Sequence, residues 1–287
     1  MKEKILLTGC NGQLGSELRK QQASLPNAEW ICTDVDELDI TDHSAVFRFV
    51  EEMGITGIVN CAAYTAVDKA EMNLGLCERL NAVAPAYLAS AINKRGGWMI
   101  QISTDYVFDG NASVPYTEDM TTCPNSVYGR TKRQGEVAVL DHCPNSVIIR
   151  TAWLYSTFGS NFVKTMMRLG NERESLNVVF DQVGSPTYAR DLATAIITII
   201  REGIKPGIYH FTNEGVASWY DFTHAIFEMA NIKNCALHPI RSKDYPTPAK
   251  RPAFSVLDKA KIKQTYDMQI PHWRDSLAEC IDKLLEQ

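Results

Sequence analysis

Long apolar runs, paired cysteine motifs and an excess of positive charge are all missing from this sequence of 287 residues. No stretch approaches the run of about 18 apolar residues that a membrane-spanning helix needs. The formal net charge of −5 offers no electrostatic footprint for a polyanion. We therefore expect neither nucleic acid nor a membrane as a partner, and an anionic small substrate would have to be held by a few local cations.

The eight cysteines include no Cys-x-x-Cys pair, and several lie in apolar runs such as the one around Cys61. This pattern is typical of buried thiols in a reducing compartment, and it argues against a disulfide framework and against a zinc site. The first residues lead into an apolar run without the features of a signal peptide. We expect a cytoplasmic protein with no bound metal.

Short apolar runs alternate with segments of helical period in the first half of the chain. The runs expected to form strands are residues 5–8, 30–34, 57–61, 98–103 and 146–150. Runs that are apolar on both faces and separated by helices indicate a parallel sheet covered on each side. The sequence therefore predicts an α/β, doubly wound (Rossmann) fold.

The alternation becomes irregular beyond Trp153, where Pro and Gly are more frequent. Tight loops of this kind suit a smaller C-terminal domain that lies over the mouth of the sheet. We expect residues 1–152, with a returning segment near 186–203, to form the dinucleotide-binding domain. Residues 153–185 and 204–287 are expected to form the substrate-binding domain.

Gly9, Gly12 and Gly15 lie directly after the first predicted strand and at the start of a helix. Glycine permits a tight turn there and lets backbone amides approach a pyrophosphate at the positive end of the helix. Three glycines can also form a simple turn, but the strand before them and the helix after them favour a dinucleotide site. Their spacing is typical of the short-chain dehydrogenase superfamily.

Asp34 ends the second predicted strand, where a carboxylate can accept hydrogen bonds from the adenosine ribose. It could equally be a turn carboxylate. A ribose contact favours NADH and repels a 2′-phosphate, whereas Arg19 and Lys20 could offset that repulsion. The sequence leaves both NADH and NADPH open as the cofactor.

Tyr128 and Lys132 are four residues apart and share one face of a predicted helix. A neighbouring ammonium, together with an oxidised nicotinamide ring, would move the tyrosine pKa from about 10 toward neutrality. The lysine could also hold the nicotinamide ribose. Such a pair also occurs by chance on exposed helices, but Ser103 and Thr104 at the end of the fourth strand supply a hydroxyl that can orient a carbonyl. Together these residues form the Ser/Thr–Tyr–Lys arrangement of a short-chain dehydrogenase.

Small residues after the third strand leave room for the riboses, although ordinary packing would also explain them. The expected cofactor contacts are Gly9, Asn11, Gly12, Gln13, Leu14, Gly15, Asp34, Asp39, Ala62, Ala63, Tyr64, Thr65, Tyr128 and Lys132.

Three segments resemble signatures of the dTDP-4-dehydrorhamnose reductase family: residues 103–110, 181–187 and 245–252, the last followed by Ser255 and Leu257. They span nearly the whole chain in the expected order. The resemblance implies an oxidoreductase that uses NADPH or NADH to reduce the C4 ketone of dTDP-4-dehydro-β-L-rhamnose. This reaction is the last step of dTDP-rhamnose biosynthesis, which supplies cell-surface polysaccharides.

The same resemblance implies that Thr104, Tyr128 and Lys132 are catalytic. The implied substrate contacts are Thr104, Asp105, Tyr106, Tyr128, Trp153, Asn161 and Arg251. Trp153 would pack against the sugar, or else be a core residue at a domain junction. Arg251, in a proline-bounded loop, suits bidentate phosphate binding, whereas Lys164 and Arg168 are explained equally well as surface residues.

Some members of this family are dimers joined through carboxylate-bound magnesium. Glu17 fits one ligand position, but Arg190 stands where a second acid would be needed. We therefore expect no metal, and the chain could be a monomer or a homodimer.

Other functions on this fold are weighed by the residues that they require. A sugar-nucleotide dehydratase needs an Asp-Glu pair after the threonine, whereas here Asp105 is followed by Tyr106. A 4-epimerase uses the same hydride chemistry but retains its NAD. A non-catalytic homologue of the regulatory subunit of methionine adenosyltransferase is disfavoured by the intact Thr104, Tyr128 and Lys132. The last two alternatives stay open.

Overall fold

The computed structural model describes residues 2–286, and within them six parallel strands form a central sheet in the order β10-β5-β4-β3-β1-β2. The strands are β1 Glu3–Thr8, β2 Ala28–Thr33, β3 Gly57–Asn60, β4 Trp98–Thr104, β5 Ser146–Thr151 and β10 Gly207–His210. The strand order changes direction beside β1, and the carboxyl ends of the strands around such a point form a ligand-binding crevice. The predicted doubly wound α/β fold is confirmed.

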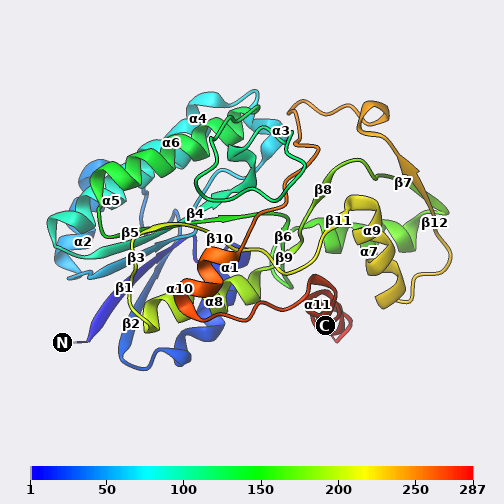
Figure 1. The fold of residues 1–287 in the computed structure, drawn as a ribbon. Helices are drawn as coiled ribbons and strands as arrows, with labels where there is room; N and C mark the ends of the chain where they lie inside the picture. Colours follow the sequence, from blue (N-terminus) through cyan, green and yellow to red (C-terminus); the bar gives the residue numbers. More distant parts are fainter. Residues whose placement is uncertain (1, 287) are drawn as a thin grey trace.

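Helices cover both faces of this sheet (Figure 1). Those on one face are α2 His43–Glu52, α5 Ala84–Lys94 and α6 Val127–His142, and those on the other are α1 Gln13–Gln21, α8 Ala189–Arg201 and α10 Ala260–Tyr266. Side chains alternate between the faces along each strand. Ile5 and Leu7 of β1 join the core under α1 and α8, whereas Leu6 joins the core under α2 and α5. This two-sided burial explains why the strands are apolar throughout.

Short elements connect the strands to these helices. They are α3 Val67–Ala70, α4 Leu74–Glu78, the π-helical turn η2 Arg79–Val83, and the 3-10 turns η1 Gln22–Ser24, η3 Asp105–Val107 and η4 Ser242–Asp244. The turn η3 directly follows β4, and it therefore begins at the carboxyl edge of the sheet.

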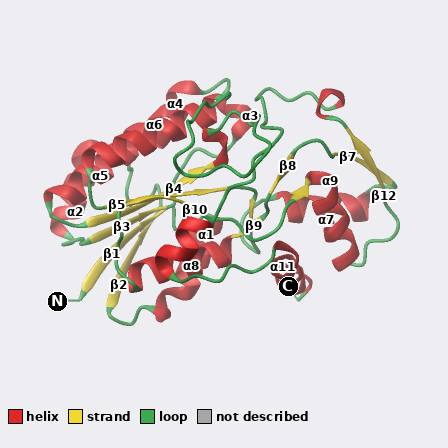
Figure 2. Ribbon diagram, in the orientation of Figure 1, coloured by secondary structure: helices red, strands yellow, loops and turns green. Residues whose placement is uncertain are grey.

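A second, smaller part of the molecule lies beyond that edge (Figure 2). Its elements are the helices α7 Phe162–Glu172, α9 Trp219–Met229 and α11 Trp273–Leu285, and the strands β6 Leu154–Tyr155, β7 Ser175–Val179, β8 Val183–Gly184, β9 Thr187–Tyr188, β11 Ala217–Ser218 and β12 Ala236–Ile240. These strands pair only across long stretches of sequence, as β7 with β12. A separate core around Phe222, Ile226 and Leu277 holds this part together.

One segment lies elsewhere than the predicted domain limits placed it. Residues 204–287 were assigned to the substrate-binding domain, but β10 pairs with β5 in the central sheet, and α10 packs beside it. The returning segment therefore extends past residue 203. Its edge strand is only four residues long and begins at the glycine of a Pro-Gly pair, which is typical of a loop in sequence. In the described part of the chain, no helix has the length and apolar character needed to cross a bilayer.

Candidate active site

The phosphate loop between β1 and α1 is shaped by close backbone contacts. Gly9 has a φ of +63°, and a Cβ there would lie 2.7 Å from the backbone nitrogen of Ala62. Any other residue would push the loop away from the end of β3. Helix α1 begins after Gly12 with no side-chain cap, so its first N–H groups are free to bind an anion. These features fit the pyrophosphate of a dinucleotide.

Asp34 and Arg19 lie together beside this loop. Asp34 accepts hydrogen bonds from the backbone nitrogens of Asn11 (3.1 Å) and Val35 (2.9 Å), and Arg19 donates to the side-chain oxygen of Asn11 at 3.1 Å. Both readings of Asp34 therefore have support, because it braces the loop and also lines the cavity. Arg19 places a cation close to the same edge, where it could favour a 2′-phosphate.

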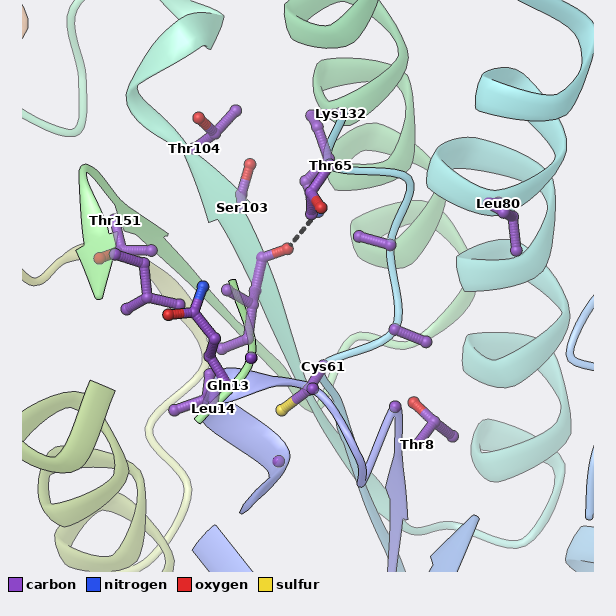
Figure 3. A pocket seen from close by; sticks show the side chains of 18 of the residues that line it. Thr8, Gln13, Leu14, Cys61, Thr65, Leu80, Ser103, Thr104, Lys132 and Thr151 are labelled. Carbon is purple, nitrogen blue, oxygen red and sulfur yellow. Dashed lines mark hydrogen bonds between the residues drawn. The ribbon is translucent and has the colours of Figure 1, made fainter. Parts of the chain in front are cut away.

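A cavity of about 920 Å³ begins at this loop and runs along the carboxyl edge of the sheet into the smaller part of the molecule. Of the predicted site residues, those that line it are Gly9, Asn11, Gly12, Gln13, Leu14, Gly15, Asp34, Asp39, Ala62, Ala63, Thr65, Thr104, Asp105, Tyr106, Tyr128, Lys132, Trp153, Asn161 and Arg251. Figure 3 shows Gln13 and Leu14 near one end of the view, with Ser103 and Thr104 farther along β4. One continuous cavity thus joins the expected cofactor and substrate residues.

Tyr64 differs from the other predicted cofactor contacts because it does not line the cavity. Its backbone nitrogen and carbonyl oxygen are both bonded to the side chain of Asn81 (2.9 and 3.1 Å), and its side chain packs against the cluster of Ala70, Cys77 and Val127. In the segment after β3, the small residues therefore line the cavity, whereas the side chain of Tyr64 packs away from it.

Tyr128 is brought to the end of β4 by the start of α6. The side chain of Ser126 caps this helix by accepting from the backbone nitrogen of Gly129. A Cβ at Gly129 would lie 2.2 Å from the carbonyl oxygen of Tyr106, so only glycine allows the helix to approach the turn η3 this closely. The rings of Tyr106 and Tyr128 meet edge to face at 5.5 Å. Tyr128 and Thr104 thus line the same part of the cavity.

The tyrosine pKa does not move in the expected direction. Burial raises the pKa of Tyr128 above its usual value, and a hydrogen bond with Thr104 only partly offsets that effect. The ammonium of Lys132 donates to the carbonyl oxygen of Ile102 at 2.6 Å. Desolvation is therefore the largest influence on the pKa of Tyr128, which remains protonated at neutral pH.

Lys132 is itself almost fully buried. Burial lowers its pKa to about 8, although the carboxylate of Glu136 raises it. The ammonium form therefore still predominates at pH 7. Asp105 is buried too, and burial raises the pKa of its carboxyl to about 6. Thr104 donates to one of its oxygens at 2.9 Å.

Aromatic rings form the far wall of the cavity. Trp153 has a φ of +48°, a strained conformation for a large side chain. Its indole stacks on that of Trp219, with ring centroids 3.5 Å apart and planes within 7° of parallel. Trp219 lines the cavity as well, and its N–H donates to Gln182. The sequence identified Trp153 but gave no signal for Trp219, which is 66 positions further along the chain.

Arg251 reaches the cavity from the C-terminal loop. Its guanidinium forms an ion pair with Asp68 of α3 at 2.8 Å and donates to the hydroxyl of Tyr106 at 3.1 Å. The other oxygen of Asp68 accepts from the backbone nitrogen of Ala249. This loop is therefore tied to the cofactor side of the cavity by a residue that sequence reasoning did not single out.

Asn161 is the N-cap of α7. Its oxygen accepts from the backbone nitrogen of Lys164, and its nitrogen donates to Gln13 and to the carbonyl of Ser156. The side chain thus joins the phosphate-loop helix to the smaller part of the molecule. Lys164 and Arg168 do not line the cavity, and Arg168 pairs with Glu172 on the surface.

Glu17 and Arg190, the two residues weighed for a metal site, both bind other protein groups. Glu17 is buried and accepts a hydrogen bond from Ser156 at 2.6 Å, and Arg190 forms an ion pair with Glu279. No group of three or more His, Cys, Asp or Glu residues within 2–286 is arranged to hold a metal ion.

Other lining residues that the sequence did not single out include Thr33, Ile102, Thr151 and Ala152. Thr151 and Ala152 are at the end of β5 and immediately after it. Their position at the carboxyl edge is the same signal that singled out Thr104, so they could have been found from the sequence.

Comparison with known proteins decides the family. The family model described as the RmlD substrate binding domain matches residues 2–286. The chain belongs to this family. A relative named dTDP-4-dehydrorhamnose reductase, from Aggregatibacter actinomycetemcomitans, is 42% identical over 284 residues, which cover 96% of this chain and 97% of the relative.

Solved structures of the RmlD family agree with this assignment. The crystal structure of a dTDP-4-dehydrorhamnose reductase from Clostridium acetobutylicum has a TM-score of 0.94 and 45% identity, covering 99% of this chain and 100% of that one. That of the Bacillus anthracis enzyme, in complex with NADP, has a TM-score of 0.95 and 38% identity over the same shares. The predicted membership of the reductase family is confirmed.

Proposed function

We propose that this chain reduces the C4 ketone of dTDP-4-dehydro-β-L-rhamnose to the alcohol of dTDP-L-rhamnose, with NADPH or NADH as the reductant. The continuous cavity that joins the phosphate loop to Thr104, Tyr128 and Lys132, and then to Trp153, is the observation that carries the proposal. The names of the RmlD-family relatives and the NADP complex of one of them support it.

The phosphate loop and Asp34 would hold the dinucleotide, because the backbone at Gly9 and the free start of α1 suit a pyrophosphate. When bound, the reduced nicotinamide supplies the hydride that the C4 carbon accepts. Lys132 would hold the nicotinamide ribose, and its bond to the carbonyl of Ile102 beside β4 supports this role. These assignments follow from position along the cavity.

The hydroxyls of Thr104 and Tyr128 would bind the ketone oxygen and orient it. As negative charge develops on this oxygen, Tyr128 donates its phenolic proton and the C4 hydroxyl forms. Burial keeps this phenol protonated at neutral pH, so the acid is present when it is needed. The indole of Trp153 would pack against the sugar, and Arg251 would bind the diphosphate.

Turnover of purified protein tests the proposal. NADPH or NADH should be oxidised only when dTDP-4-dehydrorhamnose is present, and NMR should identify the product as dTDP-L-rhamnose. Arg130→Ala is a matched control, because Arg130 is an exposed residue of α6 outside the cavity lining. Conversion of UDP-glucose to UDP-galactose with tightly retained NAD, and no reduction of the keto sugar, would overturn the proposal in favour of an epimerase.

We also propose a cellular compartment, an oligomeric state and a role for each domain. Eight free cysteines and a reductant drawn from metabolism suit the cytoplasm, and the chain would act there as a monomer or a homodimer. Residues 1–152 with 186–210 would hold the cofactor, and most of the remainder would hold the sugar nucleotide. The binding partner would then be the nucleotide sugar, and the proposed reaction requires neither nucleic acid nor a membrane.

A further inference from the structure

A buried ion pair lies next to the catalytic helix, outside the cavity lining. Glu136 of α6 and Arg150 of β5 are both almost completely buried. The guanidinium binds the carboxylate through two hydrogen bonds, each 2.8 Å long, from Nε to Oε1 and from Nη2 to Oε2. Ser103 donates to Oε1 at 2.5 Å. None of the steps described above uses this ion pair.

The pair lies next to the residues that would carry out the reduction, and Ser103 connects it to their strand. Glu136 lies one helical turn after Lys132 on α6. Ser103, which bonds Glu136, stands on β4 between Ile102, which bonds Lys132, and Thr104. Three consecutive residues of one strand therefore contact the ion pair, the lysine and the proposed substrate carbonyl. Ser103 also faces Arg150 in the register of β4 with β5.

The charges around Lys132 make the pair more than a structural contact. Lys132 is 4% exposed, and the groups that raise its pKa are the carboxylate of Glu136 and the thiols of Cys61 and Cys77. Tyr128 stays neutral because burial raises its pKa. Of the three groups that raise the pKa of Lys132, Glu136 has the largest effect.

The surroundings of Glu136 balance its charge. Arg150 supplies one buried cation, and Arg133, which is partly exposed, approaches Oε2 at 3.2 Å. His210 is 3.4 Å from Arg150, and burial together with that guanidinium lowers its pKa to about 3, so it is neutral. Removing the carboxylate alone would leave the charge of Arg150 buried and unpaired close to Lys132, which is unfavourable for a second cation.

We propose that Glu136 is a positioning residue for the reduction: fixed by Arg150 and Ser103 one helical turn from Lys132, its carboxylate keeps charged the ammonium that binds the Ile102 carbonyl of β4. The proposal rests on the proposed function only through the role given to Lys132 in holding the cofactor. It assigns the buried pair a part in cofactor binding and proton transfer.

The test is the pH dependence of NADPH binding, measured by the fluorescence of the bound cofactor. In the unaltered protein, binding should weaken as pH rises through about 8, where Lys132 loses its proton. Glu136→Gln should move this midpoint down by about one pH unit, a tenfold change in the proton equilibrium. Arg150→Met leaves the carboxylate of Glu136 without its main cation. The pH midpoint of NADPH binding should therefore move up in this variant.

Opposite shifts in the two variants are the signature of a charge effect. The neutral double variant Glu136→Gln/Arg150→Met should restore a midpoint close to that of the unaltered protein. Weaker binding at every pH with unchanged midpoints, or shifts in the same direction, would show a purely structural role and overturn the proposal. If Glu136→Gln does not fold, as judged by circular dichroism, an absent upward shift in Arg150→Met overturns it alone.

This binding measurement needs no keto sugar. Opposite midpoint shifts in a protein that fails to reduce dTDP-4-dehydrorhamnose would leave the role of Glu136 intact and refute the proposed substrate. A parallel profile of kcat/KM against pH, recorded with the keto sugar, should show the same order of midpoints if both proposals hold.

Discussion

The two halves of the cavity are built in different ways. The half proposed to hold the cofactor (the cofactor half) is formed by backbone at the ends of β1, β2 and β3, which are neighbours in register within one sheet. The half proposed to hold the sugar nucleotide (the sugar half) is formed by side chains from segments far apart in the sequence, such as Trp153, Trp219 and Arg251. The shape of the cofactor half is thus set by the backbone of the sheet, whereas the shape of the sugar half depends on contacts between individual side chains.

This difference has a consequence for how each half responds to substitution. The phosphate loop is held by the close approach of Gly9 to Ala62 and by the hydrogen bond from the backbone nitrogen of Asn11 to Asp34. The sugar half is held by pairs, Trp153 with Trp219 and Arg251 with Asp68. Substitutions in the two halves should therefore change different constants, cofactor affinity in one and the KM for the keto sugar in the other.

The largest effect is expected at the junction of the halves. Tyr128→Phe keeps the ring but removes the proton donor, so kcat should fall by about 10²–10⁴-fold while cofactor affinity and the folded state survive. Stopped-flow measurement of a single turnover isolates the chemical step. Tyr220→Phe, which removes a hydroxyl from α9 outside the cavity lining, is the control. A chemical step of normal rate in Tyr128→Phe would eliminate this tyrosine as the acid.

An intermediate effect, confined to the cofactor half, is expected from Asp34→Ala. A hydrogen bond to a charged group contributes about 1.5–3 kcal/mol, so NADH affinity should fall roughly ten- to a hundred-fold. NADPH should lose less, because its 2′-phosphate is freed from a repulsive neighbour and keeps Arg19 nearby. Titration calorimetry with both cofactors, beside the exposed Asp36→Ala as control, measures the difference. Equal losses would indicate that Asp34 serves only to brace the loop.

The smallest effect is expected in the sugar half. Stacking between two aromatic rings contributes about 0.5–1.5 kcal/mol, so Trp219→Ala should raise the KM for the keto sugar roughly three- to tenfold. Trp219→Phe should retain most of the contact. Cofactor affinity should be unchanged in both variants, since Trp219 lies on α9 and not at the phosphate loop. A loss of NADPH binding in Trp219→Ala would contradict the separation of the two halves.

Much of the cofactor half could be predicted from the sequence, because its signals are local. A strand, three spaced glycines and a helix are contiguous in the chain, and so are the positions of Tyr128 and Lys132 on one helix. Periodicity located β1 to β5 within one or two residues at each end. The backbone of a parallel sheet then brings the ends of these strands together without any further information.

Tertiary structure decided the rest. The partners Trp219 and Asp68 lie 66 and 183 positions from the residues that they contact, and nothing in their own neighbourhoods marks them as lining or tying the cavity. Burial raised the pKa of Tyr128, an effect that the sequence could not show because desolvation depends on every group packed around a side chain. The sequence by itself determined which chemical groups stand at the carboxyl end of each central strand. Only the folded chain determined which distant side chains complete the sugar half, since such contacts arise from packing and have no period in the sequence.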